Sequence, residues 1–432
     1  MGHACPRDAI RPRFPTTHAG FIEPQTKFIE PMSPPIWQRP VFVLLCGSLI
    51  VFISLGVRNS FGLFMRPISM DMGWGRETLS LALAIQVLLV GAAAPFAGML
   101  ADRWGAPKII MIGGALFASG VFLMAQSTTP AGMIAAGGLL AGIGFGACGF
   151  PLILAAVGQV APEAKRSLWL GIVSAGGISG QLVIIPLSQF LISTYDWVFA
   201  LTALALVAGI VIPLAYATSG AISKTTGKDT DMDLASALRE AAGHPGFWLL
   251  TAGFYVCGFQ VQFLGIHLPA YLVDQGLSAN FGASTLMLIA FCNMLGASFF
   301  GYLGGRFSKK KLLSGIYMGR AIVIYVFISQ PVTPTTVIVF ATAIGLLWLC
   351  TIPLTVGLVA QMFGVRYMAV LYGITFLSHQ LGSFTGVWFG GWLFDTSGSY
   401  AAIWWWLIAL GVVASLLHMP INERPVPRLQ QA

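Results

Sequence analysis

The sequence contains few charged residues: 9% of its 432 residues are Asp, Glu, Lys or Arg, whereas 56% are apolar. A soluble protein of this length uses roughly 25% charged residues to cover its surface. A chain so poor in charge must present most of its surface to lipid, which excludes an ordinary soluble enzyme. We therefore expect a membrane protein.

The sequence also lacks the motifs of common enzymes and metal proteins. Its six cysteines are scattered without metal-ligand or disulfide spacing, and we interpret them as packing residues. It has no nucleophile elbow, phosphate-binding loop, zinc pattern or pair of intramembrane carboxylates. We predict that the protein is not an enzyme and that it uses no metal and no cofactor.

Long apolar segments recur along the whole chain. A helix that crosses a hydrocarbon layer of ~30 Å needs ~20 mostly apolar residues. The alternating ~10-residue segments of a transmembrane β-barrel are absent, so the predicted fold class is an all-α membrane protein. Twelve segments are predicted to be transmembrane helices, namely 41–65, 79–100, 108–126, 131–157, 168–192, 197–217, 247–272, 281–303, 311–328, 335–360, 368–393 and 400–419.

The formal net charge of +8 follows the expected membrane topology. If the N-terminus is cytoplasmic, most Lys and Arg residues fall in the two tails and the inner loops, whereas Arg66 and Arg76 fall outside. This bias is the positive-inside rule. It predicts a multi-pass protein of the cell inner or plasma membrane with both termini in the cytoplasm, and it gives no reason to expect nucleic-acid binding.

The two halves of the chain repeat one pattern at an offset of about 200 positions. Gly56-x-Arg58-x-x-Phe61 resembles Gly258-x-Gln260-x-x-Phe263, and Pro151 and Pro353, which we expect to bend the fourth and tenth spans, occupy equivalent places. The pattern predicts two pseudo-symmetric six-helix bundles. The predicted parts are a disordered cytoplasmic tail at 1–36, an N-terminal bundle at 37–217, a cytoplasmic linker at 218–245 with a short helix near 234–242, a C-terminal bundle at 246–420 and a cytoplasmic tail at 421–432.

The loop after the second span, Gly98-Met-Leu-Ala-Asp102-Arg103-Trp-Gly105-Ala-Pro-Lys108, resembles the signature loop of the major facilitator superfamily. A degenerate copy after the eighth span has Gly305 in place of the aspartate. The resemblance implies the major facilitator fold, a monomer, and a substrate site near the midplane between the halves. We expect charge pairs to form a cytoplasmic gate, the alternative being that these charges serve topology alone. The expected gate residues are Gly98, Asp102, Arg103, Gly105, Lys108 and Arg306.

Within that superfamily, the first span resembles the monocarboxylate-porter and oxalate/formate-exchanger branch. The residues that carry this resemblance are Gly56-Val-Arg58-Asn59-Ser60-Phe61-Gly62, followed by Gly73-Trp74-Gly75-Arg76. Membership of this branch implies transport of small carboxylates, often coupled to protons or to counter-exchange.

Two arginines, Arg58 and Arg320, lie within predicted spans. An ionised side chain at mid-membrane is costly and commonly marks a functional site. Because a guanidinium can hold a carboxylate through two parallel hydrogen bonds, we predict that Arg58 binds the substrate; an outward snorkel of its side chain is the alternative. For Arg320, a contact with substrate and a structural partner such as a backbone carbonyl both remain open.

The remaining polar residues of the spans complete the predicted site. His379 in the eleventh span could carry a coupling proton near neutral pH or make a structural hydrogen bond, and no Asp or Glu lies at mid-membrane. A cavity with arginines and no acids favours an anion, so we predict a secondary carrier of small organic anions, such as monocarboxylates. An efflux carrier for amphipathic molecules and a membrane sensor are the alternatives. Further predicted substrate contacts are Asn59, Gln260, Gln262 and Asn293.

Overall fold

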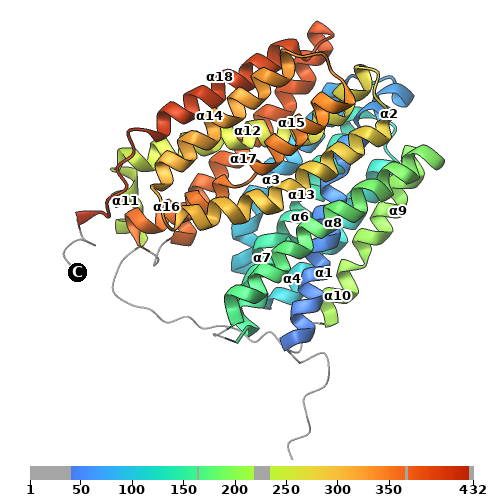
Figure 1. The fold of residues 1–432 in the computed structure, drawn as a ribbon. Helices are drawn as coiled ribbons and strands as arrows, with labels where there is room; N and C mark the ends of the chain where they lie inside the picture. The colour runs from blue at the N-terminus through green and yellow to red at the C-terminus, as the bar shows by residue number, and fades with distance from the viewer. Residues whose placement is uncertain (1–39, 163–164, 218–233, 365–367, 428–432) are drawn as a thin grey trace, which may run out of the picture. The chain divides into compact units, whose positions relative to one another are not determined.

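The computed structural model of the protein describes residues 40–162, 165–217, 234–364 and 368–427. In these ranges the regular secondary structure is entirely helical (Figure 1). The predicted tail at 1–36 and most of the linker lie outside the described residues. The part of the linker that is described forms α11 (Leu234–Ala242), the short helix expected there.

The first half of the chain supplies six spans. Eleven segments of the described chain are long and apolar enough to cross a membrane, and six of them lie in this half. Its elements are α1 (Pro40–Asn59), η2 (Phe61–Phe64), α2 (Met65–Met72), α3 (Arg76–Trp104), α4 (Ala106–Ala125), α5 (Pro130–Met133), η3 (Ile134–Leu140), α6 (Ala141–Cys148), α7 (Phe150–Val160), α8 (Arg166–Thr194), α9 (Trp197–Gly209) and α10 (Val211–Ala217).

The second half repeats this arrangement. Five of its helices or helix pairs are among the eleven apolar segments; α17 is not, because Ser378, His379 and Gln380 interrupt its apolar sequence, yet its 30 residues suffice to cross. Counting α17, the described residues hold twelve segments long enough to cross a membrane, which is the predicted number. The elements are α12 (Pro245–Asp274), α13 (Ala279–Gly304), α14 (Lys309–Ile328), α15 (Pro334–Leu346), α16 (Thr351–Phe363), α17 (Met368–Ser397) and α18 (Ala401–His418).

Close helix pairs in each half confirm the internal repeat. A Cβ atom on Gly180 of α8 would overlap the carbonyl oxygen of Phe52 in α1, and a Cβ on Gly382 of α17 would overlap that of Tyr255 in α12. Small residues allow such close approach of helix backbones inside a bilayer. The pairs α1–α8 and α12–α17 are therefore equivalent, as the sequence repeat requires.

The two equivalent prolines interrupt their spans, as expected. In the fourth span the extended backbone of Gly149 (φ −78°, ψ −176°) separates α6 from α7 just before Pro151. In the tenth span a short break separates α15 from α16 just before Pro353. Proline has no N–H to donate and its ring clashes with the carbonyl four residues earlier. The break in the tenth span leaves backbone groups that need other partners.

The two halves are joined near one end of the helices. The hydrogen bonds described between the halves link residues 76–87 to residues 267–400. We call the end of the helices that holds Arg66, Arg76 and Asp274 the Arg76 end. The opposite end, which holds residues 98–108 and α11, is called the linker end. The described hydrogen bonds between the two halves therefore lie toward the Arg76 end.

Candidate functional site

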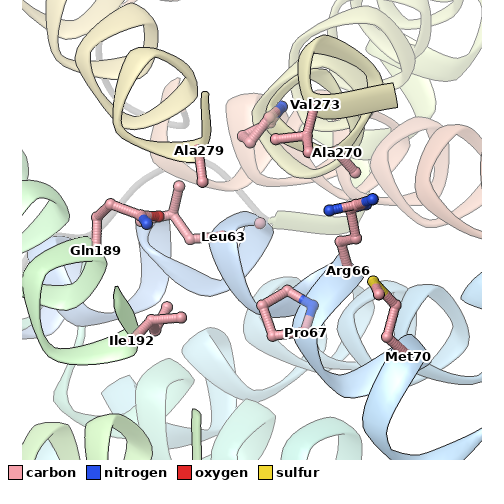
Figure 2. Close-up of a pocket in the computed structure, with 11 residues that line it drawn as sticks. Leu63, Arg66, Pro67, Met70, Gln189, Ile192, Ala270, Val273 and Ala279 are labelled. Carbon is pink, nitrogen blue, oxygen red and sulfur yellow. The ribbon is translucent and has the colours of Figure 1, made fainter. Parts of the chain in front are cut away.

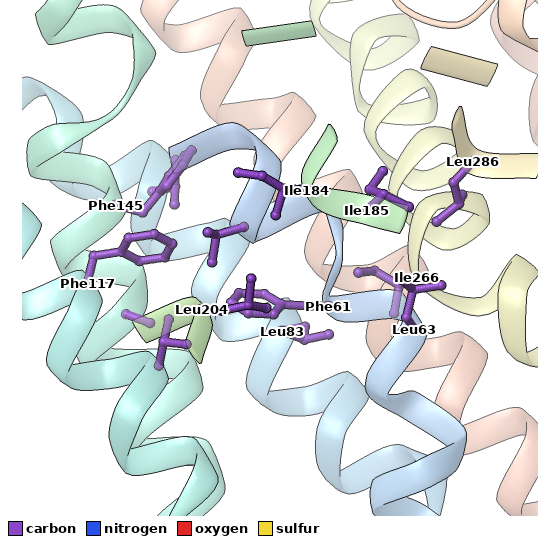
Figure 3. Close-up of a cluster of buried hydrophobic side chains, with 14 of the residues drawn as sticks. Phe61, Leu63, Leu83, Phe117, Phe145, Ile184, Ile185, Leu204, Ile266 and Leu286 are labelled. Carbon is purple, nitrogen blue, oxygen red and sulfur yellow. The ribbon is translucent and has the colours of Figure 1, made fainter. Parts of the chain in front are cut away.

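Arg58 is unpaired within the membrane. It lies in the last turn of α1, and its guanidinium carbon is 5.2 Å from the ring centroid of Phe145 in α6. Phe145 packs edge-on against Phe117, within the apolar cluster of Figure 3. The buried Nε of Arg58 has no hydrogen-bond partner, and neither ion pair in the described part of the chain involves Arg58. Its guanidinium therefore faces the fourth span, and no described residue forms an ion pair with it.

The polar residues predicted to share a site with Arg58 differ in availability. The Asn59 side chain donates to the carbonyl oxygen of Leu55 over 2.9 Å, which leaves its amide oxygen uncommitted. Gln262 is half-buried and has no hydrogen bond to a described residue. Gln260 is fully buried, and its amide nitrogen donates to the Leu407 carbonyl over 2.8 Å. Asn59 and Gln262 therefore remain candidates, whereas Gln260 holds α12 to α18.

Arg320 compensates for the break in the tenth span. Its side chain is 1% exposed; Nε donates to the Leu347 carbonyl over 2.8 Å and Nη2 donates to that of Trp348. Its Nη1 lies 3.4 Å from both the Gln260 amide oxygen and the Cys257 sulfur. Unsatisfied carbonyls inside a membrane are costly, so these contacts favour the structural alternative for Arg320 over the predicted contact with substrate.

Asn293 also satisfies a backbone group at the break in the tenth span. Its amide oxygen accepts the backbone N–H of Leu349 over 3.0 Å, and the residue is buried. Arg320 thus supplies donors and Asn293 supplies an acceptor to the unwound backbone between α15 and α16. This contact uses the amide oxygen of Asn293, and the predicted contact of Asn293 with substrate stays a prediction.

His379 has one committed nitrogen and one free nitrogen. Nδ1 lies 3.0 Å from the amide oxygen of Gln380, which can only accept, so Nδ1 carries a hydrogen. Nε2 is buried and has no hydrogen-bond partner. The Gln380 amide nitrogen in turn donates to the Val87 carbonyl of α3 over 2.7 Å, which links His379 to the opposite half. The free Nε2 is a position at which a proton could bind.

The predicted gate residues of the linker end are apart from acidic partners. Arg103 and Lys108 are exposed, and Arg306 lies over the ring of Tyr302 at 4.5 Å; none has an ion pair in the described ranges. Gly105 has a φ of +93°, which favours glycine at the turn between α3 and α4. Gly98 has open space where a Cβ would lie, and the side chain of Asp102 lies outside the described residues. The cytoplasmic gate at these residues stays a prediction.

A polar cluster at the Arg76 end joins the two halves. From the sequence, only two positive charges are expected on this outer side. Nη1 and Nη2 of Arg76 donate to the two carboxylate oxygens of Asp274 over 2.6 and 2.8 Å. The guanidinium lies 3.8 Å from the ring centroid of Phe394, and the Arg76 side chain is 8% exposed. The ion pair therefore connects α3 to α12 in a largely buried setting.

Asp395 of α17 holds the N-terminus of α3. Its carboxylate oxygens accept the backbone N–H groups of Arg76 and Glu77 over 2.9 and 2.7 Å. Gly75, the residue before α3, has no side chain to do this, and a Cβ there would meet Asp395. A carboxylate at a helix N-terminus satisfies free N–H groups and the helix dipole. The Glu77 carboxylate also accepts the Trp388 indole N–H over 3.0 Å.

His267 and Tyr400 extend this cluster inward. The Tyr400 hydroxyl accepts from Arg76 Nη1 over 3.0 Å, and burial raises the pKa of Tyr400 to about 12, so its hydroxyl stays protonated. His267 Nε2 lies 2.9 Å from the Val387 carbonyl and must donate to it, so Nδ1 accepts the Tyr400 hydroxyl hydrogen over 3.0 Å. The donor and the acceptor of each hydrogen bond from Arg76 through Tyr400 and His267 to Val387 are thereby assigned. In the sequence, Arg76 is notable because it falls on the outer side, against the positive-inside rule.

Comparison with known proteins agrees with this fold. A family model described as Major Facilitator Superfamily matches residues 47–387. The chain is 24% identical over 357 residues to the oxalate:formate antiporter of Oxalobacter formigenes, covering 80% of this chain and 82% of that protein. It is 24% identical over 344 residues to monocarboxylate transporter 12-B of Danio rerio, covering 72% of this chain and 71% of that protein.

Solved structures show the same fold. A bacterial homologue of the human lysosomal transporter Spinster, crystallised in an inward-facing and occupied conformation, matches with a TM-score of 0.72 at 15% identity. The match covers 90% of this chain and 98% of that chain. The family resemblance inferred from the signature loop and the first span is confirmed.

Proposed function

Because this chain belongs to the major facilitator superfamily and is a multi-pass membrane transporter rather than an enzyme, we propose that it is a secondary active carrier of small organic anions. The substrate class is the monocarboxylates, moved by alternating access with proton coupling or exchange. The carrier lies in the inner or plasma membrane with its termini and the linker end in the cytoplasm and the Arg76 end outside.

The unpaired guanidinium of Arg58 is the observation that carries the proposal. A positive charge within a span that has no acidic partner is compensated by an anion, and a carboxylate can accept two of its hydrogen bonds. The acids of the described spans lie at helix ends, such as Glu77, Asp274 and Asp395. Asn59 and Gln262 complete the proposed site. The names of the oxalate:formate and monocarboxylate relatives support the same substrate class.

The contacts between the halves support alternating access. Ion pairing and hydrogen bonding join the halves at the Arg76 end, while the charged loops of the linker end have no ion pair among described residues. A carrier closed to the outside and open to the cytoplasm has this distribution of contacts. The cycle then requires the Arg76 cluster to open, and the gate formed by Arg103, Lys108 and Arg306 to close.

His379 is the proposed site of proton coupling. It lies on α17, which contacts the opposite half through Gln380, and its Nε2 has no hydrogen-bond partner. Binding of a proton there would change the charge of the cavity that holds the anion.

Uptake by reconstituted protein tests the substrate class. The purified carrier is placed in liposomes and offered labelled lactate, formate, oxalate and a neutral sugar, with and without a pH gradient. Arg58→Gln should abolish carboxylate uptake, Arg58→Lys should retain part of it, and Lys311→Gln, which removes an exposed charge at the linker end, should transport like the native protein.

Preserved carboxylate uptake by Arg58→Gln would refute the role of this arginine. Transport of amphipathic cations without carboxylate transport would support the alternative of an efflux carrier. That alternative is disfavoured because no acid lies at mid-membrane in the sequence to attract a cation.

A further inference from the structure

A small pocket separate from the Arg58 region lies at the Arg76 end, between the two halves. Its volume is about 140 Å³. A cavity of roughly 150 Å³ accommodates a molecule of benzene size, about six non-hydrogen atoms. The walls are mostly apolar; Leu63, Pro67 and Ile192 come from the first half, and Ala270, Val273 and Ala279 come from the second.

Two polar side chains without hydrogen bonds line the pocket. Figure 2 shows the Arg66 guanidinium and the Gln189 amide on opposite sides of it, with Leu63 and Pro67 between them. Gln189 is 5% exposed, and no hydrogen bond joins its amide to a described residue. Arg66 makes no hydrogen bond with a described residue either. Burial of an amide without a partner is costly, so a ligand that hydrogen-bonds to Gln189 would be favoured in the pocket.

The charge near the pocket is positive. The nearest acid to Arg66 is Asp274, whose Oδ1 lies 3.7 Å from Arg66 Nε, beyond hydrogen-bond distance. Both oxygens of that carboxylate already accept from Arg76. Two guanidinium groups therefore share one carboxylate, and the Arg66 side chain, which is 42% exposed, can accept an anion from the aqueous side.

We infer that this pocket is a second binding site, for a short-chain carboxylate of about the size of butyrate, a molecule of about six non-hydrogen atoms. The carboxylate of the ligand pairs with Arg66, its alkyl chain lies along Leu63, Pro67 and Ala270, and the Gln189 amide binds water or a polar substituent at the far end. The site is distinct from the proposed transport site at Arg58.

The lining residues of the pocket come from both halves, so a ligand bound there should affect transport. Because the walls come from both halves, the pocket exists when the Arg76 end is closed and is lost when the halves separate there. A ligand that binds one state shifts the equilibrium toward that state. External carboxylate at this site therefore holds the carrier closed to the outside. This consequence, unlike the binding itself, depends on the proposed alternating access.

Butyrate binding to full-length protein in lipid nanodiscs tests the site. Saturation-transfer difference NMR, which detects weak ligands, is applied to Arg58→Gln, in which the transport site is disabled. Butyrate binding should persist in this variant, fall at least tenfold in Arg58→Gln/Arg66→Gln, and persist in the charge-matched control Arg58→Gln/Lys311→Gln. Gln189→Leu, tested in the same background, fills the polar side of the pocket without altering charge and should change the bound pose rather than abolish binding.

Absence of butyrate binding in correctly folded Arg58→Gln protein, with an unchanged melting temperature, would overturn the second site. Binding that survives Arg66→Gln at full strength would also overturn it. Either result leaves the proposed transport function untouched, whereas a lack of carboxylate uptake by the native protein would refute that function and leave the second site standing.

Spin labels at the Arg76 end test the consequence for transport. Labels at Thr194→Cys on α8 and Asn280→Cys on α13, both exposed, report the separation of the halves by double electron–electron resonance. Butyrate should shift the distance distribution toward its shortest component, and Arg66→Gln should remove this shift. A shift toward longer distances would contradict the state preference.

Discussion

Arg76 and Asp274 form a two-bonded ion pair between α3 and α12, with donor–acceptor distances of 2.6 and 2.8 Å. The two residues are far apart in the sequence and belong to opposite halves of the carrier. Around them Asp395, Tyr400 and His267 satisfy the remaining polar groups. The pair is placed where a carrier that alternates between two states must break and re-form contacts.

Removing the Asp274 charge should favour opening of the Arg76 end. Leaving a buried charge without its partner costs about 3 kcal/mol, and because each 1.4 kcal/mol corresponds to a tenfold change, Asp274→Asn should raise the open population by roughly a hundredfold. Ser80, fully buried behind the pair, provides a reporter. In Ser80→Cys protein, labelling by a membrane-impermeant thiol reagent from outside should accelerate when Asp274→Asn is added.

A cysteine at the exposed Ser193 is the matched control and should react equally fast in both backgrounds. Equal labelling rates at Ser80→Cys with and without Asp274→Asn would show that the ion pair does not hold this end closed.

Arg320 should contribute to the thermal stability of the protein rather than to substrate binding. In Arg320→Met, which keeps the volume of the side chain, the Leu347 and Trp348 carbonyls lose their donors, and each unsatisfied buried group costs about 1–3 kcal/mol. The melting temperature of the purified protein should fall with and without substrate. Arg58→Gln should melt at or above the native temperature, since it removes an uncompensated charge within the membrane. An Arg320→Met protein with native thermal stability but no substrate binding would restore Arg320 to the substrate site.

His379→Asn should separate proton movement from substrate movement. The asparagine amide can still donate to the Gln380 oxygen, as Nδ1 of His379 does, but it cannot bind a proton. Accumulation of carboxylate driven by a pH gradient should be lost, whereas exchange of internal for external carboxylate at equal pH should continue. An unchanged ratio of protons to substrate would exclude the histidine as the proton carrier.

The segment after α18 should stabilise the linker end of the second half. In this segment, which begins the predicted cytoplasmic tail at 421–432, Glu423 accepts the Lys310 backbone N–H at the start of α14 over 2.8 Å, and Lys310 Nζ donates to the Ile421 carbonyl over 2.6 Å. Glu423→Gln should lower stability by about 1 kcal/mol through the loss of a helix-end charge. Thermal unfolding measures the effect, and Arg424→Gln, an adjacent change of similar size, serves as the control. Equal melting temperatures for the native protein and Glu423→Gln would show that this contact adds no stability.

The sequence by itself determined the membrane class, the twelve spans, the repeat and the two proline breaks. These features are readable because lipid requires each spanning segment to satisfy its own backbone hydrogen bonds, so length and apolarity identify a helix without reference to its neighbours. Gly180 and Gly382 could be matched by register alone. The polar residues within α17 could also be identified from the sequence, and His379 is one of them.

The tertiary structure decided which polar side chains are free. Arg58 and Arg320 are both arginines within spans, yet Arg320 meets the broken backbone between α15 and α16, whereas Arg58 meets the face of Phe145. Arg76 looked like one more loop charge until α12 brought Asp274 to it. The physical reason is that hydropathy is a property of one segment, whereas the partner of a buried charge depends on how separate helices pack.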